Sequence, residues 1–404
     1  MPRDDAVVPP LPLPKSAASS FDPVDPSVVT TATDRKPKAG MALCLSGGGS
    51  RAMLFHAGAI LRLAEVGVLP RLDCVSAVSG GAITAGLLAK VWVRNGGPPS
   101  PTVVKAELIE PLLDLSTKLI DVPAFIIGTI LPRSSPGRRL AGALEQHLFK
   151  GFTLGDLPDK PEFVINSTNL STGALWRFSK EFVGDYQVGG GPRPRLKVAM
   201  AIGASSSFPP FFTPFTLRFG PRTAWPLSGK LKADRVQAFR RRVDLGDGGI
   251  YDNLGLETAW KRFETVLVSD GGGTYKLNPE LPTDVIRLAI RVTETIDHQV
   301  RSLRLRQIME SYDPEDKTPP KRKGAFWGIR TPFSKYPDRP AGIDAPEERT
   351  DELALVGTHM RGLKPEIAHR IVNWGYAISD AALRSYMKDI ELDDPALPFS
   401  SDGI

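Results

Sequence analysis

A serine, an aspartate and a run of glycines are the residues of this sequence whose types and spacing could do chemistry together. Ser79 lies in AVSGGA, between a run typical of a buried strand and one typical of a helix, with the small residues Ala77 and Gly81 two positions to either side. A serine in such a sharp strand-to-helix turn is the geometry of a nucleophile elbow. Capping of the helix is the other role that this fragment alone allows for Ser79. Ser76 falls inside the strand pattern, so its side chain should not reach the elbow.

The glycines of LSGGGSRA could supply the anion site that a nucleophilic serine needs. Gly47, Gly48 and Gly49 follow a strand-like run and precede a helix-like one, so they lie at a predicted helix N-terminus. Amides at such a terminus bind anions, either a phosphate or the charge that develops on a carbonyl oxygen. The loop on its own leaves both ligands open.

The base for Ser79 has to be sought among histidines and carboxylates. None of the histidines falls in a glycine-rich loop at a strand end; they are His56, His147, His298, His359 and His369. His56 falls within the first predicted helix, which indicates a packed or capping residue. Asp247, in VDLGDGG, follows a strand-like run and precedes two glycines that allow close approach, although an Asp-Gly pair is also typical of a turn. The other candidate carboxylates are Asp244, Asp252 and Asp270.

Ser79 and Asp247 together could carry out acyl transfer without a histidine. Asp247 would take the proton from Ser79 as the serine attacks an ester carbonyl, and would later take one from the hydrolytic water. An ordinary aspartate, with a pKa of about 4, is a weak base at neutral pH. We therefore expect partial burial to raise the pKa of Asp247.

The elements that must position these residues form an alternating pattern. Strand-like runs at 41–46 and 72–78 each precede a helix-like run, at 53–69 and 80–93. This order predicts a parallel sheet with crossover helices, an α/β fold. Strands that end in Asp-Gly indicate loops gathered at one edge of the sheet, where α/β proteins place their sites. Further β-type runs lie at 162–170, 175–179, 243–247, 265–273 and 284–292.

Length and composition are those of an ordinary globular protein. The 404 residues are 41% hydrophobic and 24% charged, with a formal net charge of +6, which suits anionic surfaces without indicating nucleic acid. Cys44 and Cys74 lie in strand-like runs without metal-ligand spacing, so we expect reduced core residues and a cytoplasmic protein. No apolar run reaches the length of a membrane span, and the nearest candidate, 119–132, is too short.

Three segments have a distinct composition. Residues 1–38 are proline-rich and predict a disordered arm. Residues 216–242 hold eight Lys and Arg and one acid, which predicts either a solvated surface or a contact with anionic headgroups of a membrane. Residues 297–311 predict a partly amphipathic helix with arginines.

These motifs together resemble those of the patatin-like phospholipase family. GGGSRA at 47–52, AVSGG at 77–81 and DGG at 247–249 match, in order, the family's glycine-rich oxyanion loop, nucleophile elbow and late aspartate motif. The resemblance extends over residues 40–275. Supporting stretches lie at 152–158, 166–179 and 199–215.

The resemblance implies a three-layer patatin-like α/β fold with a mostly parallel central sheet flanked by helices. It also implies a lipid acyl hydrolase, a phospholipase or lysophospholipase, with Ser79 as the nucleophile, Asp247 as the base, and no metal or cofactor. The oxyanion and substrate-binding residues would be Gly47, Gly48, Gly49 and Arg51. Asp270 becomes a structural residue. Ala77 and Ala52 replace glycines of the family pattern, and both are small enough to keep the turns.

Three regions are expected along the chain. A disordered arm at 1–38 precedes a catalytic domain at 39–295, which carries the basic insertion at 216–242. A C-terminal helical region at 296–404 packs on that domain. The expected partners are a lipid acyl ester as substrate and an anionic membrane surface in peripheral contact with the insertion, with no nucleic acid.

Other functions fit the same residues. The dyad could serve an acyltransferase or a thioesterase, in which another acceptor takes the acyl group. A fold kept for lipid binding without catalysis is a second alternative. Nucleotide binding is a third, because GGGSRA partly fits a dinucleotide fingerprint with Asp73 where a ribose ligand would be sought, but the loop lacks the Gly-Lys-Ser/Thr of a P-loop.

Overall fold

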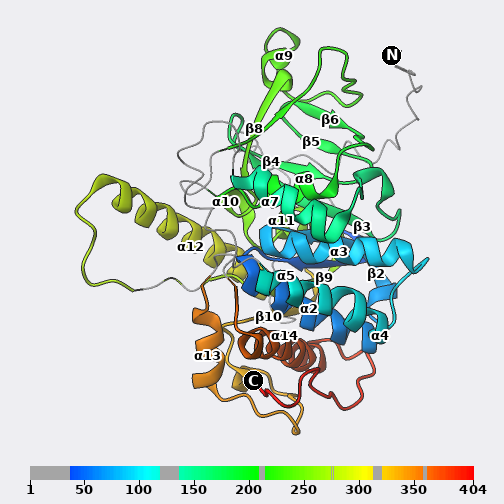
Figure 1. The fold of residues 1–404 in the computed structure, drawn as a ribbon, viewed down its shortest axis with the longest axis vertical. Coiled ribbons are helices and arrows are strands. Elements are labelled where there is room, and N and C mark those ends of the chain that lie inside the picture. Colours follow the sequence, from blue (N-terminus) through cyan, green and yellow to red (C-terminus); the bar gives the residue numbers. More distant parts are fainter. Residues whose placement is uncertain are drawn as a thin grey trace.

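A ten-stranded sheet runs through the centre of the molecule, with helices on both of its faces (Figure 1). A computed structural model describes residues 37–118, 136–208, 214–273, 275, 277–312, 321–357 and 362–404. The strands are β1 Lys38–Leu45, β2 Leu72–Ala77, β3 Glu162–Asn169, β4 Ala174–Phe178, β5 Val183–Asp185, β6 Gly189–Gly191, β7 Phe215–Arg218, β8 Arg242–Asp247, β9 Phe263–Asp270 and β10 Lys323–Gly328.

The strand order places the parallel half of the sheet beside an antiparallel half. The order is β10-β9-β1-β2-β3-β4-β5-β6, and β8 pairs with both β3 and β7. The five strands from β10 to β3 are parallel, whereas β4 to β8 pair antiparallel with their neighbours. The predicted α/β class and its parallel sheet with crossover helices are confirmed, and the antiparallel strands extend that sheet.

Helices cover the two faces of the sheet because the strand side chains alternate between them. In β1, Leu43 and Leu45 belong to the core that includes side chains of helices α2 Gly49–Glu65, α3 Ser79–Arg94 and α14 Pro365–Tyr386. Ala42 and Cys44 face the other core, with Cys74 and side chains of helices α11 Leu256–Trp260 and α12 Val285–Tyr312, so both cysteines are buried as predicted. The α-helices are α2 Gly49–Glu65, α3 Ser79–Arg94, α4 Pro101–Val104, α5 Glu110–Lys118, α7 Pro136–Leu144, α8 Val198–Ser205, α9 Ala233–Arg241, α10 Gly249–Asp252, α11 Leu256–Trp260, α12 Val285–Tyr312, α13 Glu347–Leu355 and α14 Pro365–Tyr386.

Helix α12 corrects one prediction. Residues 284–292 were expected to form a β-type run, but from Val285 onward they are the first turns of this helix, which extends away from the rest of the molecule (Figure 1). Val285, Leu288 and Val292 are spaced by three and four positions, which is helical spacing. Their branched side chains favoured the strand, but the helical period is the stronger signal. The arginine-bearing helix predicted at 297–311 is the remainder of α12.

The C-terminal region packs directly on the helix that follows the glycine loop. Gly58 of α2 and Gly375 of α14 bring the two backbones together: a Cβ atom on Gly58 would lie 1.9 Å from the carbonyl oxygen of Val372, and one on Gly375 would lie 1.9 Å from that of Phe55. A buried ion pair of 2.8 Å between Arg62 and Asp380 joins the same helices. The region predicted as helical also contributes β10, which pairs with β9.

Some predictions concern residues outside the described part of the chain. They include nearly all of the predicted arm at 1–38, and the apolar segment 119–132. Among the described helices, none combines the length and hydropathy that would let it cross a bilayer.

Candidate active site

Ser79 lies at the turn from β2 into α3, in a backbone conformation that side chains rarely adopt. Its φ angle is 48°, in the left-handed region where a non-glycine residue is strained and the surroundings must hold it. Helix α3 begins at Ser79 with Val78 as its N-cap residue, so Ser79 does not occupy the capping position. A Cβ atom on Gly80 would lie 2.2 Å from the carbonyl oxygen of Gly49, so the elbow and the glycine loop pack backbone against backbone.

A chain of hydrogen bonds fixes this elbow. The amide of Ser79 donates to the hydroxyl of Ser205 on α8, at 2.8 Å, and that hydroxyl donates to the carbonyl oxygen of Asn166 on β3, at 2.6 Å. The side-chain amide of Asn166 donates to Ser76 and to the carbonyl oxygen of Ala77, at 2.9 and 3.1 Å. Ser76 is therefore a buried partner in this chain of bonds. Sequence analysis missed Ser205 and Asn166 as site residues, although each lies in a stretch that supported the family resemblance.

Asp247 ends β8 and is 5% exposed. Its carboxylate accepts a hydrogen bond from the amide of Gly249 at 2.7 Å, and its carbonyl oxygen accepts one from the Thr168 hydroxyl at 2.8 Å. Burial raises the pKa of Asp247 to about 7, and the negative charge of Asp297 on α12 adds to the rise; hydrogen bonds from the Gly249 amide and the Ser79 side chain act in the opposite direction. The carboxylate is thus in contact with the serine and titrates near neutral pH.

The glycine loop has no room for side chains. Gly48 and Gly49 have φ angles of 142° and 63°, and a Cβ atom on Gly48 would lie 2.7 Å from the carbonyl oxygen of Gly271. A Cβ atom on Gly47 would lie 2.4 Å from the side-chain oxygen of Asn253. The amide of Gly47 donates to the backbone carbonyl oxygen of Asn253 at 3.0 Å. Within the described part of the chain, the amides of Gly48 and Gly49 donate to no acceptor, so they can bind an incoming anion.

Arg51 connects this loop to distant segments. Its side chain is 1% exposed and donates to three carbonyl oxygens: Gly271 at 3.2 Å, Ala354 at 2.9 Å, and Val356. Burial and the nearby positive charge of Arg301 lower the pKa of Arg51 to about 10. The contacts in the structure make Arg51 a support for the glycine loop, and the substrate-binding role expected from the resemblance stays a prediction.

A sequence model of the patatin-like phospholipase family matches residues 43–260, which is more than half of the chain. The chain belongs to the patatin-like phospholipase family.

Solved structures that match the chain come from human and bacterial proteins. Human GIVD cytosolic phospholipase A2 is 13% identical with a TM-score of 0.50, over 86% of this chain and 59% of that one. VipD from Legionella pneumophila is 17% identical with a TM-score of 0.36, over 86% and 67% of the two chains. Full-length ExoU of Pseudomonas aeruginosa, solved with SpcU, is 19% identical with a TM-score of 0.26, over 68% and 53%.

At 13% identity, the similarity to the human protein shows a common fold and nothing more. The chain spans 59% of the length of that human structure. None of the curated proteins compared with the chain matches it.

The other titratable candidates of this patatin-like protein have structural partners. His56 is buried, with its two ring nitrogens 2.7 Å from the Ser269 hydroxyl and 2.9 Å from the Ser46 carbonyl oxygen, and burial lowers its pKa to about 4. It is the packed histidine that the sequence predicts. Asp270 is buried and forms an ion pair with Arg301. His359 lies outside the described residues.

Asp252 and Asp244 also form local contacts. Asp252 accepts hydrogen bonds from the amides of Leu254 and Glu257, at 3.1 and 2.6 Å, and so shapes the turn between α10 and α11. Asp244 pairs with Arg242 at 2.8 Å. Among the described residues, no three His, Cys, Asp or Glu side chains are grouped as a metal ion would require.

Asp73, the candidate ribose ligand, lies far from the glycine loop. It accepts a hydrogen bond from the amide of Met41 at 2.9 Å and pairs with Lys160 at 2.7 Å. Met41 and Asp73 lie near the amino ends of two parallel strands, whereas Gly47 follows the carboxyl end of β1. The two parts of the dinucleotide fingerprint are therefore at opposite edges of the sheet.

Proposed function

We propose that this member of the patatin-like phospholipase family hydrolyses fatty acyl esters of lipids, as a phospholipase or lysophospholipase. The observation that carries the proposal is the contact between Ser79, held in a strained left-handed turn, and Asp247, whose pKa is raised to about 7. A serine nucleophile needs a base within hydrogen-bond reach, and a base is most effective when its pKa lies near the working pH.

The reaction proceeds in two halves at these residues. Asp247 accepts the proton of the Ser79 hydroxyl while the oxygen of Ser79 attacks the ester carbonyl carbon. The tetrahedral intermediate then collapses, the carbon–oxygen bond of the ester breaks, and the protonated Asp247 returns the proton to the leaving alcohol. A water molecule next attacks the acyl-serine ester and gives its proton to Asp247. Collapse releases the fatty acid, and Ser79 regains its proton.

The glycine loop stabilises the charge that develops in both halves. The amides of Gly48 and Gly49 are available to an oxyanion because neither donates to a described acceptor, and Gly47 positions the loop through its bond to Asn253. Removal of one such donor typically lowers kcat by about 10² to 10³. These donors act without reorganisation because the tight packing of the loop fixes their direction.

The test is a pair of substitutions assayed on a soluble p-nitrophenyl acyl ester and on phospholipid vesicles. Ser79→Ala and Asp247→Asn should abolish turnover on both substrates, and Ser401→Ala, an exposed serine distant in sequence, should leave it unchanged. A fluorophosphonate should transfer its phosphonyl group to Ser79, with release of fluoride, in the unaltered protein and in Ser401→Ala but not in Ser79→Ala. Turnover that survives both dyad substitutions would overturn the assignment.

Product analysis separates hydrolysis from transfer. Mass spectrometry of a mixed-lipid reaction should show free fatty acid in proportion to the deacylated lipid. Acyl groups recovered instead on an added alcohol or thiol would identify the acyltransferase or thioesterase alternative, because the same acyl-serine serves both.

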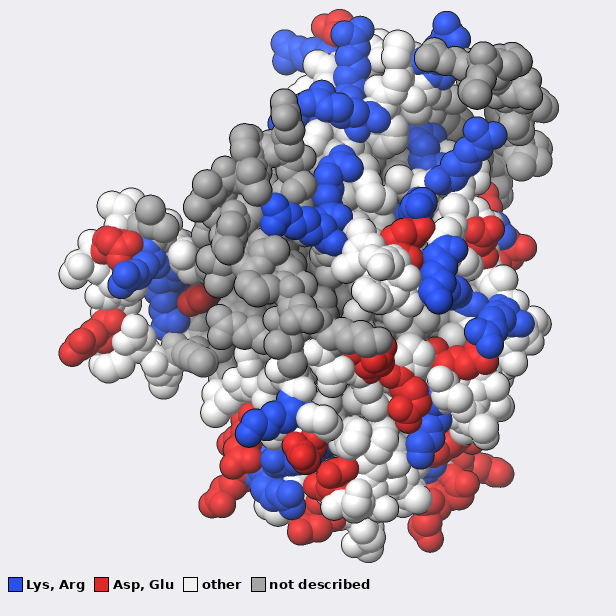
Figure 2. All heavy atoms as spheres, in the orientation of Figure 1, with Lys and Arg blue, Asp and Glu red and all other residues white. Residues whose placement is uncertain are grey.

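The basic insertion, residues 216–242, is proposed to contact anionic headgroups. It forms β7, a loop and α9, and Figure 2 shows Lys and Arg side chains gathered at the end of the molecule where α9 lies in Figure 1. Attraction of this kind weakens as salt screens the charges. Sedimentation with vesicles should therefore show binding to anionic vesicles that falls at high salt, and equal binding to neutral and anionic vesicles would remove this role.

A further inference from the structure

The side chain of Asn253 lies where the three motifs of the candidate active site meet. Asn253 follows α10, and its backbone carbonyl oxygen accepts the hydrogen bond from the amide of Gly47. The place that a Cβ atom on Gly47 would take is 2.4 Å from the side-chain oxygen Oδ1 of Asn253 and 3.3 Å from the Cβ atom of Ser79. The side chains of Asn253 and Ser79 are therefore neighbours at the glycine loop.

The same oxygen of Asn253 is also next to the candidate base. A Cβ atom on Gly249 would lie 2.8 Å from Oδ1 of Asn253 and 3.0 Å from Oδ1 of Asp247. Gly47 and Gly249 come from two different motifs, and their lack of side chains leaves room for this one oxygen. The amide oxygen of Asn253 is thus beside both the proposed nucleophile and the proposed base.

The side-chain amide of Asn253 remains available to a molecule that enters the site. The residue is half-buried, and within the described part of the chain this amide forms no hydrogen bond. A polar group that is withdrawn from bulk water without a partner costs free energy unless a water molecule or a ligand pairs with it. A water molecule beside Asn253 would provide that pairing.

Release of the acyl group from Ser79 requires a water molecule in a fixed orientation. The water must present a lone pair to the carbonyl carbon of the acyl-serine while one of its hydrogens points to the carboxylate of Asp247. Its second hydrogen needs another acceptor. Oδ1 of Asn253 is an acceptor of the right kind, and it lies next to the carboxylate that takes the first hydrogen.

We propose that Asn253 holds the hydrolytic water during deacylation of Ser79, an inference that rests on the acyl hydrolase activity proposed above. The oxygen of the water forms a bond to the acyl carbon, and the bond between that carbon and the oxygen of Ser79 breaks. The proton that the water gives to Asp247 passes to the oxygen of Ser79. The second hydrogen, which Asn253 accepts as a hydrogen bond, leaves on the fatty acid.

This role is confined to the second half of the reaction. In the first half the hydroxyl of Ser79 is the attacking group, and no water molecule takes part. Loss of the Asn253 amide should therefore slow deacylation and leave acylation as it is. A donor to the oxyanion acts in both halves, so its loss would slow both.

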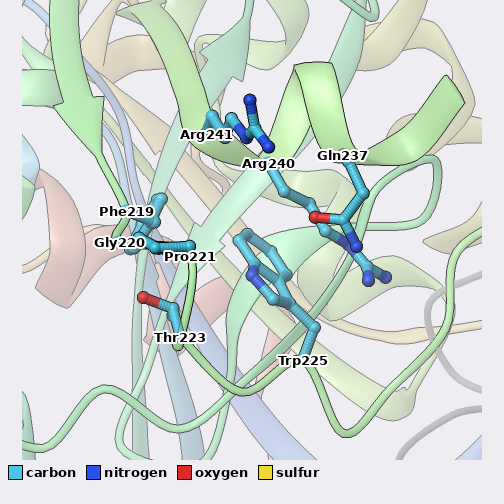
Figure 3. Close-up of a pocket in the computed structure, with 8 residues that line it drawn as sticks. All are labelled: Phe219, Gly220, Pro221, Thr223, Trp225, Gln237, Arg240 and Arg241. Carbon is cyan, nitrogen blue, oxygen red and sulfur yellow. The ribbon is translucent and has the colours of Figure 1, made fainter.

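The pocket beside α9 is a different feature, remote from this place. It has a volume of about 250 Å³ and is lined by residues of the loop after β7, among them Trp225, and of α9, among them Arg240 (Figure 3). Helix α9 ends at Arg241, and β8 then runs from Arg242 to Asp247. The pocket therefore lies at the opposite end of β8 from the candidate base and cannot hold the hydrolytic water.

The test is the kinetics of Asn253→Ala on a p-nitrophenyl acyl ester, whose fast acylation makes deacylation the slower step. The substitution keeps the backbone bond to Gly47, so the glycine loop retains its support. We expect kcat to fall about fivefold or more and KM to fall with it, so that kcat/KM, which reports acylation alone, stays the same. Rapid mixing should show a burst of p-nitrophenol, and intact mass spectrometry should show the acyl group on the protein during turnover.

The matched control is Asn95→Ala. Asn95 is exposed and caps the opposite end of α3, about 24 Å from Ser79 at 1.5 Å for each residue, so kcat and KM should not change. The amplitude of the burst counts the folded, active molecules and so guards against misfolding of Asn253→Ala. Asn253→Leu, which keeps a side chain of similar size without an acceptor, should behave in the same way as Asn253→Ala. An unchanged kcat, or equal losses of kcat and kcat/KM, would overturn the role of Asn253.

The same assay separates failure of this inference from failure of the proposed function. No release of p-nitrophenol by the unaltered protein, or equal release by Ser79→Ala, would mean that the proposed ester hydrolysis is wrong. Hydrolysis that depends on Ser79, together with no acylated protein in either Asn253 variant during turnover, would contradict the role of Asn253 alone.

Discussion

The backbone amide of Ser79 donates a hydrogen bond of 2.8 Å to the hydroxyl of Ser205, which comes from a helix more than a hundred residues later in the chain. The bond holds the strained turn from α8, while the hydroxyl is itself held by the carbonyl oxygen of Asn166. Ser205 therefore acts as a positioning residue for the proposed nucleophile.

Ser205→Ala should lower kcat without a matching change in KM. One lost hydrogen bond is worth about 1 kcal/mol, and the carbonyl oxygen of Asn166 also loses its donor, so we expect kcat on the soluble ester to fall about five- to thirtyfold. The control is Ser206→Ala, because the neighbouring hydroxyl is buried without a hydrogen-bond partner among the described residues. Equal effects of the two substitutions, or a change confined to KM, would contradict the positioning role.

The rate of ester hydrolysis should rise with pH through about 7. Asp247 must be ionised to accept the proton of Ser79, and its pKa is about 7, so kcat should fall about tenfold for each pH unit well below that value. Initial rates between pH 5 and 9 provide the profile. Asp297→Asn should move the midpoint to lower pH, because the charge of Asp297 raises the pKa of Asp247. A profile that is flat between pH 5 and 8 would show that another group is the base.

Asp247→Asn should stabilise the protein at high pH although it abolishes turnover. The folded state holds a proton on Asp247 up to pH of about 7, whereas an unfolded aspartate releases it at about 4, so the folded state binds more protons in between. The free energy of unfolding of the unaltered protein therefore falls as pH rises from 4 to 7. Asparagine carries no charge and avoids this loss.

Melting temperatures at pH 5 and pH 8 measure this effect. The difference between Asp247→Asn and the unaltered protein should favour the variant more at pH 8, by up to a few kcal/mol, since one unit of pKa corresponds to about 1.4 kcal/mol. Asp402→Asn, at a half-buried pair with His369, is a control for the loss of one carboxylate. A stability difference that does not change with pH would mean that Asp247 is not forced to ionise in a buried setting.

Gly48→Ala should greatly lower kcat because it displaces the backbone of the glycine loop. The new Cβ atom would lie 2.7 Å from the carbonyl oxygen of Gly271, and the φ angle of 142° disfavours any side chain, so the loop must move and its amides with it. We expect kcat to fall by about 10² or more, as in the loss of an oxyanion donor. Gly97→Ala is the matched control, because nothing lies within 4 Å of its added Cβ atom. Normal turnover in Gly48→Ala would exclude the loop from catalysis.

The sequence predicted those parts of the site that depend on local turns. The glycines at 47–49, the elbow at Ser79 and the Asp-Gly pair at 247 each follow a strand, and short-range chemistry alone indicates their conformations. The parallel sheet followed from the alternation of strand-like and helix-like runs.

Contacts between distant segments could not be read in the same way. No local pattern predicts that the Ser205 hydroxyl accepts a hydrogen bond from the amide of Ser79, or that the Asn253 carbonyl oxygen accepts one from the amide of Gly47. The start of helix α12 was predicted as a strand because its branched residues are typical of strands. The nine residues 284–292 are also too few to indicate the length of the whole helix. These features depend on tertiary packing, which single-sequence patterns do not contain.

The crossing of α2 and α14 sets a limit on how the protein can be shortened. The family match ends at residue 260, so a shortened chain that lacks the C-terminal third would still contain the whole matched region. Gly58 and Gly375 allow the two backbones to touch. Removal of α14 would therefore expose buried apolar side chains of α2, the helix that follows the glycine loop, to water. A version meant for screening or crystallisation should therefore keep the chain through Tyr386, and a library that varies Gly58 or Gly375 would lose most of its members to misfolding.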